Sequence, residues 1–273
     1  MHVPGPESLA RLARYDAVLV RVVAAEGSVP RECGAWMLVW DDAIDGTVGG
    51  GQLEFQAIAH ARAGPVPPAG ASQVRRYPLG PSLGQCCGGV VHLSFERVGA
   101  ADAPALAARL APTRLPVALF GGGHVGRALV QVLAPLPTYT LTWIDSRDGV
   151  FPDTLPPHVR CEHSDPVQAA VADLSAGSQV VIMSFSHAED LDIVATCLRR
   201  QRERGDLPFV GLIGSRTKWA TFRHRLAQRG FSQEELAHVT CPIGMPGVVG
   251  KEPEVIAVAV AAQLLQRRAI APG

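Results

Sequence analysis

Two adjacent cysteines in a glycine-rich segment are the residues of this chain best suited to unusual chemistry. Residues 84–89 read GQCCGG, which places Cys86 and Cys87 between glycines. A disulfide between neighbouring cysteines closes a strained ring and joins nothing distant. Flanking glycines allow close approach to a ligand and leave thiols unshielded. The pair therefore indicates a soft-metal or sulfur-handling site, or else two small buried apolar side chains, since free cysteine is commonly buried.

A second glycine-rich segment has the spacing of a dinucleotide-binding turn. An apolar run, residues 117–120, leads into GGGHVG, with glycines at Gly121, Gly123 and Gly126. The first permits a tight turn, the second admits a phosphate, and the third packs helix against strand. Free amides at the helix start then bind an anion. Asp145 ends the next strand about 20 residues on, where an acid commonly accepts a hydrogen bond from a ribose hydroxyl.

Four polar residues in the second half of the chain each have two interpretations. His124 lies inside the glycine turn, where a ligand contact or a helix cap is more expected than a hydride partner. Arg147 either prefers a 2′-phosphate or sits in solvent. His187 follows an apolar strand and is catalytic or merely neighbours a helix cap, with the second slightly favoured. Lys218 faces a phosphate or belongs to a solvated basic helix.

The first half of the chain has its own candidate anion site. Gly49, Gly50 and Gly51 precede Gln52 and a helical pattern. Three glycines at a helix start present bare amides to an anion. The alternative is a tight turn between a strand and a helix, with no ligand.

The elements that must position these segments fall into two groups. In the first half, extended runs and one helix (52–63) predict a small α+β domain; the runs are 17–25, 35–40, 73–79 and 90–96. In the second half, apolar runs at 117–120, 140–144, 180–185 and 209–213 alternate with helical patterns at 125–133, 188–204 and 218–229. Continuous apolar runs are typical of parallel strands buried on both faces. The predicted fold class is α/β, with a C-terminal Rossmann-like doubly wound parallel sheet and a smaller N-terminal α+β domain.

The domain boundaries follow from composition. We predict an N-terminal domain over residues 1–99, a linker over 100–116 and the Rossmann-like domain over 117–273. The linker is rich in alanine and proline and contains a short helix between helix breakers. The closing helix, residues 253–268, either completes the Rossmann layer or crosses back to the first domain.

Composition excludes several classes of protein. The 273 residues are 47% hydrophobic, and Lys plus Arg equals Asp plus Glu at 25 each, which argues against nucleic-acid binding. No apolar run reaches the ~18 residues of a membrane span, and residues 1–14 lack the pattern of a signal peptide. Six cysteines without a CxxC pair disfavour a zinc site or a secreted disulfide framework. We therefore expect a cytoplasmic protein.

The motifs also occur in a recognisable order. They are GSVPR at 27–31, GGGQLE at 49–54, LGQCCGG at 83–89, GGGHVG at 121–126, IGSRTK at 213–218, CPIG at 241–244 and PEVIA at 253–257. Together they resemble the xanthine dehydrogenase accessory protein family, the XdhC/CoxI group of molybdoenzyme maturation factors. The match runs over nearly the whole chain, and GQCCGG combined with GGGHVG is its most specific part.

This resemblance implies a cytoplasmic chaperone, usually a homodimer, rather than an enzyme. Such proteins bind the molybdenum cofactor, as molybdopterin or its cytosine dinucleotide form, while a cysteine desulfurase installs the terminal sulfido ligand. They then deliver it to xanthine dehydrogenase or a related hydroxylase. On this resemblance Cys86 and Cys87 meet the metal or its sulfur, and Gln85 is a polar contact. The turns at Gly49–Gln52 and Gly121–Gly126 then hold the phosphate or the nucleotide tail.

Two other functions are compatible with the residues alone. The turn at Gly121 and the acid Asp145 are also expected in an NAD(P)-dependent oxidoreductase, which would make NAD(P) the cofactor. The vicinal thiols of Cys86 and Cys87 alone would suit a redox-responsive protein.

Overall fold

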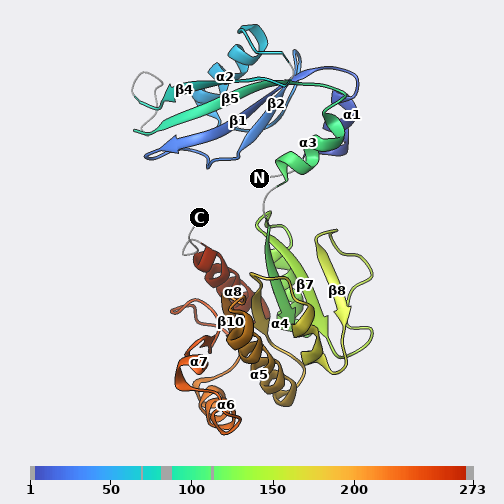
Figure 1. Ribbon diagram of the computed structural model, residues 1–273, viewed down its shortest axis with the longest axis vertical. Helices are drawn as coiled ribbons and strands as arrows, with labels where there is room; N and C mark the ends of the chain where they lie inside the picture. Colours follow the sequence, from blue (N-terminus) through green and yellow to red (C-terminus); the bar gives the residue numbers. More distant parts are fainter. Residues whose placement is uncertain (1–3, 69, 81–87, 112–113, 269–273) are drawn as a thin grey trace. The chain divides into compact units, whose positions relative to one another are not determined.

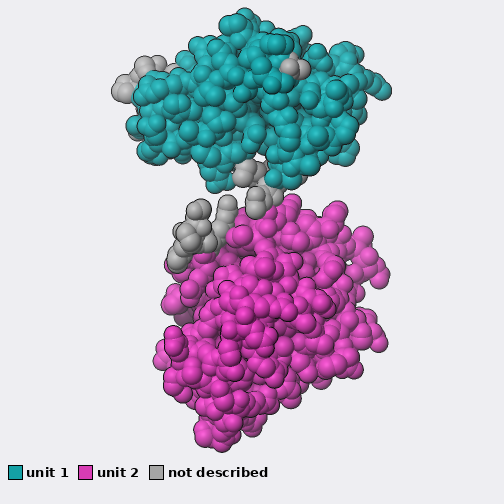
Figure 2. Space-filling model, viewed as in Figure 1, with its two compact units in different colours: residues 1–112 teal, residues 113–273 magenta. Residues whose placement is uncertain are grey.

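The computed structural model describes residues 4–68, 70–80, 88–111 and 114–268. The chain forms two compact units, Met1–Pro112 (unit 1) and Thr113–Gly273 (unit 2), each with its own sheet and core (Figures 1 and 2). The predicted combination of a Rossmann-like domain with a smaller α+β domain is confirmed.

Unit 1 is built on a five-stranded antiparallel sheet in the order β3-β2-β1-β5-β4. Its elements are α1 (Pro6–Leu12), β1 (Ala17–Glu26), β2 (Trp36–Val39), β3 (Ile44–Gly46), α2 (Gly51–Ala63), β4 (Ser72–Pro78), β5 (Val90–Val98) and α3 (Ala103–Leu110). Leu53, Ala57 and Ala61 of α2 recur every four residues and pack on one face of the sheet. The sequence did not predict α1 or β3, because elements of seven and three residues carry too little periodicity.

The structure differs from the predicted division of the chain at residues 100–116. The helix expected there is present as α3, but it packs into unit 1. Leu106 and Leu110, one helical turn apart, lie in the same core cluster as Leu12, Leu19 and Trp36. Alanine and proline gave the segment a linker-like composition, whereas its two leucines place it in the core.

Unit 2 contains a six-stranded parallel sheet in the order β11-β10-β9-β6-β7-β8 (Figure 1). Its strands are β6 (Leu115–Phe120), β7 (Tyr139–Asp145), β8 (Val159–His163), β9 (Gln179–Ile182), β10 (Phe209–Leu212) and β11 (Val239–Thr240). If the six strands are numbered from 1 to 6 in chain order and the sheet is read from β8 to β11, the order is 3-2-1-4-5-6. This is the arrangement of dinucleotide-binding folds. The order reverses between β6 and β9, so the ligand crevice of such a fold lies at the carboxyl ends of these two strands.

Helices cover both faces of this sheet. They are α4 (His124–Leu133), the 3₁₀ helix η2 (Val167–Asp173), α5 (His187–Arg204), α6 (Arg216–Gln228), α7 (Gln233–Ala237) and α8 (Pro253–Arg268). Leu129 and Leu133 of α4 share a core cluster with Val260 and Leu264 of α8. The closing helix therefore completes a helical layer of unit 2, which answers the question that the sequence left open.

The predicted strands and helices of unit 2 are present, but β8 and β11 were missed. β8 reads VRCEH, a polar mixture rather than an apolar run, and β11 has two residues. Cys197 of α5 is fully buried in the core of unit 2, and burial raises the pKa of its thiol to about 12. This thiol therefore stays neutral at physiological pH.

The capping box of α7 gives a pH-dependent prediction. Glu235 accepts hydrogen bonds from the Arg202 guanidinium and the Ser232 amide, which lower its pKa from 4.5 to about 2. A carboxyl group with a lowered folded-state pKa stabilises the protein above its unfolded pKa, and that contribution is lost as the pH falls. We expect Glu235→Gln to lower the unfolding midpoint at pH 7, with a difference from wild type that shrinks toward pH 3.

Thermal unfolding of both proteins at pH 7, 5 and 3 checks this expectation. Glu234→Gln is the matched control, because Glu234 is exposed on the same short helix and has no ion-pair partner among the described residues. A difference between wild type and Glu235→Gln that stays constant over this pH range would contradict the assignment.

Candidate functional site

The glycine turn of unit 2 joins β6 to α4 at the point where the strand order reverses. A Cβ at Gly121, where φ is +124°, would lie 2.0 Å from the Met183 carbonyl oxygen. A Cβ at Gly126 would lie 2.0 Å from the Gly121 carbonyl oxygen. No side chain fits at these separations. Glycine is therefore required at both positions for the turn to pack against β9 and α4.

The middle of the same turn is open. Gly123 is the N-cap of α4, has an ordinary φ of −74°, and a Cβ there would meet nothing within 4 Å. Among the described residues, the amides of Gly123, His124 and Val125 donate no hydrogen bond. These amides lie at the positive end of the α4 dipole, so they form a candidate anion-binding position of unit 2.

Asp145 lies at the predicted position but is fully engaged by the protein itself. Its carboxylate is 2% exposed and accepts from the Gly122 amide at 2.6 Å. The other donors are the amide, Nε and Nη2 of Arg147, each at 2.9 Å. Burial alone raises the pKa of Asp145, but these hydrogen bonds lower it overall. Both oxygens of this ionised carboxylate are thus already paired, and the guanidinium of Arg147 is held by Asp145 rather than standing free in solvent.

The turn after β9 forms the other side of the crevice. Ser186 caps α5 by accepting from the Glu189 amide at 3.2 Å, and His187 is the exposed first residue of that helix. The helix-cap interpretation of His187 agrees with this placement. Ser146, which follows β7, donates to Glu189 of α5 at 2.6 Å, and this bond links the ends of the two strands that flank β6.

Lys218 has a role that the sequence did not predict. Its Nζ lies 2.5 Å from the buried carboxylate of Asp190, which also accepts from the Ser184 amide at 2.9 Å. Lys218 is therefore neither a solvated residue nor a free phosphate ligand, and the ion pair holds the β9–α5 turn against α6. Cys241, after β11, is half-buried, and burial raises the pKa of its thiol to about 11.

In unit 1, loops that carry three of the sequence motifs meet at one end of the sheet. A Cβ at Gly27 would lie 3.3 Å from the Cα of Gly89, and a Cβ at Gly49 would lie 2.6 Å from Cγ of Pro30. The exposed Cys33 lies in the Pro30 loop. Gln85, Cys86 and Cys87 lie outside the described residues.

Glu54 occupies most of the glycine turn expected to bind an anion in unit 1. Its Oε2 accepts from the Val48 amide at 3.0 Å and the Gly50 amide at 3.2 Å, and from the Thr47 hydroxyl. The Gly49 amide donates to that hydroxyl at 3.2 Å. Thus Gly49 and Gly50 serve an internal turn, while the amides of Gly51 and Gln52 have no acceptor among the described residues.

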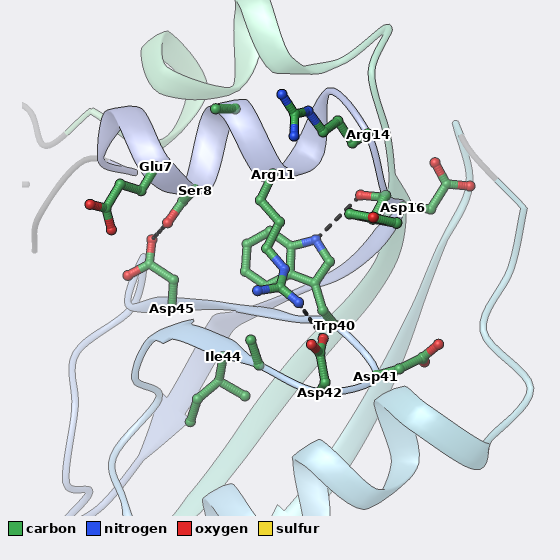
Figure 3. Close-up of a pocket in the computed structure, with 13 residues that line it drawn as sticks. Glu7, Ser8, Arg11, Arg14, Asp16, Trp40, Asp41, Asp42, Ile44 and Asp45 are labelled. Atoms are coloured by element: carbon green, nitrogen blue, oxygen red, sulfur yellow. Dashed lines mark hydrogen bonds and ion pairs between the residues drawn. The ribbon is translucent and has the colours of Figure 1, made fainter.

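A hollow of about 910 Å³ lies between α1 and the β2–β3 turn of unit 1 (Figure 3). Arg11 stacks over Trp40 and pairs with Asp42, while Ser8 donates to Asp45 at 2.6 Å. None of the sequence motifs contributes a residue to its lining. The chemistry indicated by the motifs therefore belongs elsewhere in the molecule.

Two features are absent from the described part of the chain. No group of three or more His, Cys, Asp or Glu side chains there is arranged to hold a metal ion. No helix in it is both long and apolar enough to cross a membrane.

Comparison with known proteins gives consistent matches. The sequence profile of the XdhC Rossmann domain matches residues 117–264, and that of the XdhC and CoxI family matches residues 10–78. The uncharacterized protein YqeB of Escherichia coli (strain K12) is 25% identical over 264 residues, covering 93% of this chain and 44% of that protein. The chain thus spans less than half the length of this relative.

A crystal structure gives the corresponding match in fold. A Bacillus halodurans protein described as a xanthine dehydrogenase superposes with a TM-score of 0.74, over 97% of this chain and 96% of that one. The sequence identity is 18%, so the likeness shows a shared fold across both units.

Proposed function

Because the chain belongs to the XdhC and CoxI family, we propose that it is an accessory factor in the maturation of xanthine dehydrogenase or a related molybdenum hydroxylase. The observation that carries the proposal is the glycine turn of unit 2. It offers free amides at the start of α4, while Asp145 is already paired with Gly122 and Arg147. This combination favours a phosphorylated ligand that does not depend on a ribose-binding acid.

The residues present fit the molybdenum cofactor. Amides at Gly123 and His124 suit its phosphate, and those of Gly51 and Gln52 offer a second such position. Thiolates suit a soft metal or its sulfur, which is the role we propose for the pair Cys86–Cys87, with Gln85 as a polar contact. When bound, the cofactor supplies the dithiolene-held molybdenum whose terminal sulfido ligand the target enzyme needs.

We further propose that the chain holds the cofactor in the cytoplasm while a partner cysteine desulfurase adds this sulfido ligand. The protein, as a homodimer, then transfers the cofactor to its target. In these steps the amides of a glycine turn would bind the phosphate, and the two thiols would shield the metal end.

Anaerobic loading with molybdenum cofactor, followed by metal analysis of the desalted protein, tests the proposal. We expect the wild type to retain molybdenum and both Cys86→Ala and Cys87→Ala to lose most of it, because each variant removes a soft ligand. Cys33→Ala is the control, since Cys33 is an exposed free thiol of the same unit. Equal and negligible molybdenum in all four proteins would refute cofactor binding.

A second candidate, an NAD(P)-dependent oxidoreductase, is favoured by the strand order and the GGGHVG turn. The paired carboxylate of Asp145 argues against it, because no oxygen remains for a ribose hydroxyl. Titration with NADH and NADPH separates the two functions. Micromolar affinity accompanied by turnover would establish the oxidoreductase.

A further inference from the structure

An exposed aromatic ring with a guanidinium stacked on it lies beside the crevice of unit 2. Phe185, in the turn between β9 and α5, is 67% exposed. Cζ of Arg147 lies 4.6 Å from the centre of its ring. Asp145 fixes this guanidinium through two hydrogen bonds of 2.9 Å. The ring and the guanidinium are thus held together before any ligand arrives.

The contacts of the turn place this pair next to the anion position. The glycine turn packs on the start of the β9–α5 turn, because a Cβ at Gly121 would lie 2.0 Å from the Met183 oxygen and 3.2 Å from the Ser184 amide nitrogen. Phe185 is the next residue. Arg147 follows β7, and the free amides follow β6. All three groups therefore lie at the carboxyl ends of neighbouring strands in one sheet.

We propose that Phe185 and Arg147 form a stacking platform for a flat nitrogen heterocycle whose phosphate binds at the amides of Gly123 and His124. Aromatic rings and guanidinium groups both stack on such heterocycles, largely independently of hydrogen-bond pattern. The inference rests on the proposed function, because the heterocycle is then the pterin of the molybdenum cofactor or the cytosine of its dinucleotide form. Since Asp145 offers no free oxygen, ring stacking rather than ribose recognition selects the ligand.

Two substitutions test the stacking platform without altering the amides of the anion position. Phe185→Ala removes the ring at an exposed position, where substitutions rarely change folding stability. Arg147→Lys keeps a positive charge beside Asp145 but loses the planar group that stacks. Tyr15→Ala is the matched control, because Tyr15 is an aromatic residue of unit 1 with a similar exposure of 63%.

Anaerobic equilibrium dialysis of the full chain uses three probes: molybdenum cofactor without a nucleotide, CMP and inorganic phosphate. The first two distinguish a pterin from a cytosine ligand. For whichever ring probe the wild type binds, we expect Phe185→Ala and Arg147→Lys to raise the Kd of that probe about tenfold. Phosphate affinity should remain that of the wild type in both variants, and Tyr15→Ala should match the wild type with every probe.

The outcomes distinguish this inference from the proposed function. Equal affinity of wild type and Phe185→Ala for the ring probes overturns the platform alone. The platform is also overturned if Phe185→Ala loses phosphate binding to the same extent as it loses binding of the ring probe. Wild-type binding of CMP but not of the nucleotide-free cofactor, weakened by Phe185→Ala, supports the platform and assigns it to the cytosine of the dinucleotide form. A wild type that binds neither ring probe overturns both.

Discussion

Gly121→Ala is expected to destabilise unit 2 strongly, whereas Gly123→Ala, two residues away in the same turn, has little effect on its stability. The added methyl group at Gly121 would lie 2.0 Å from a backbone oxygen, and φ there is +124°. Overpacking and a left-handed conformation each cost about 1–3 kcal/mol. Their sum is a large fraction of the ~5–15 kcal/mol that stabilises a typical domain.

At Gly123 neither cost arises. Its φ is −74° and a Cβ would meet nothing within 4 Å, so alanine costs at most about 1 kcal/mol, the usual penalty at an N-cap. Urea unfolding followed by circular dichroism compares the two variants with wild type. Equal midpoints for Gly121→Ala and Gly123→Ala would show that the turn is not packed as described.

The folded Gly123→Ala variant also reports on the ligand. The open space at this position is where a phosphate can approach the backbone, so an added methyl group should weaken phosphate binding while unit 2 stays native. Undiminished phosphate binding by Gly123→Ala would show that phosphate does not bind at the start of α4.

Arg200→Met is the second variant with a large expected effect. Arg200 is 5% exposed and donates to the carbonyl oxygens of Val171 at 2.6 Å and Leu174 at 2.7 Å, and to the Asp206 carboxylate. Methionine fills a similar volume but leaves these buried acceptors unpaired. Leaving a buried carbonyl oxygen without a donor costs about 1–3 kcal/mol. Two such oxygens lose their donor and the part-exposed Asp206 loses its partner, so we expect a loss of several kcal/mol in the free energy of unfolding.

Arg202→Met is the control, two residues along the same helix. Arg202 pairs with Glu235 in a half-exposed position, where an ion pair contributes less to stability than the buried hydrogen bonds of Arg200 do. The pH dependence of stability provides a second test of the role of Arg200. The Arg200 guanidinium lowers the pKa of Asp206, so this stabilisation is present above pH 4 and lost below it. An Arg200→Met midpoint within error of Arg202→Met at pH 7 would refute the structural role.

The parallel strands and the glycine turn of unit 2 could be predicted because local chemistry specifies them. Apolar runs such as residues 117–120 form strands buried on both faces, and Gly121 and Gly126 are needed at a turn of this shape. Short elements escaped prediction, because β3 and β11 have too few residues to show a period. Leu106 and Leu110 identified α3 as core only once their partners were known.

The roles of charged side chains could not be read in the same way. Asp145, Glu54 and Lys218 are residue types that commonly bind ligands, and they lie beside glycine turns or strand ends. Each instead bonds to groups of its own chain: Asp145 to Gly122 and Arg147, Glu54 to the turn before α2, and Lys218 to Asp190. Such pairing depends on which segments meet in space.

The sequence by itself therefore determined the family, the two-part α/β architecture and the positions of the glycine turns, because these follow from backbone conformation and local apolar patterns. Only the tertiary structure decided which amides remain free, where the closing helix packs and which charges are already neutralised. The physical reason is that hydrogen bonds and ion pairs join residues distant in the chain, such as Lys218 and Asp190, and their formation depends on three-dimensional proximity.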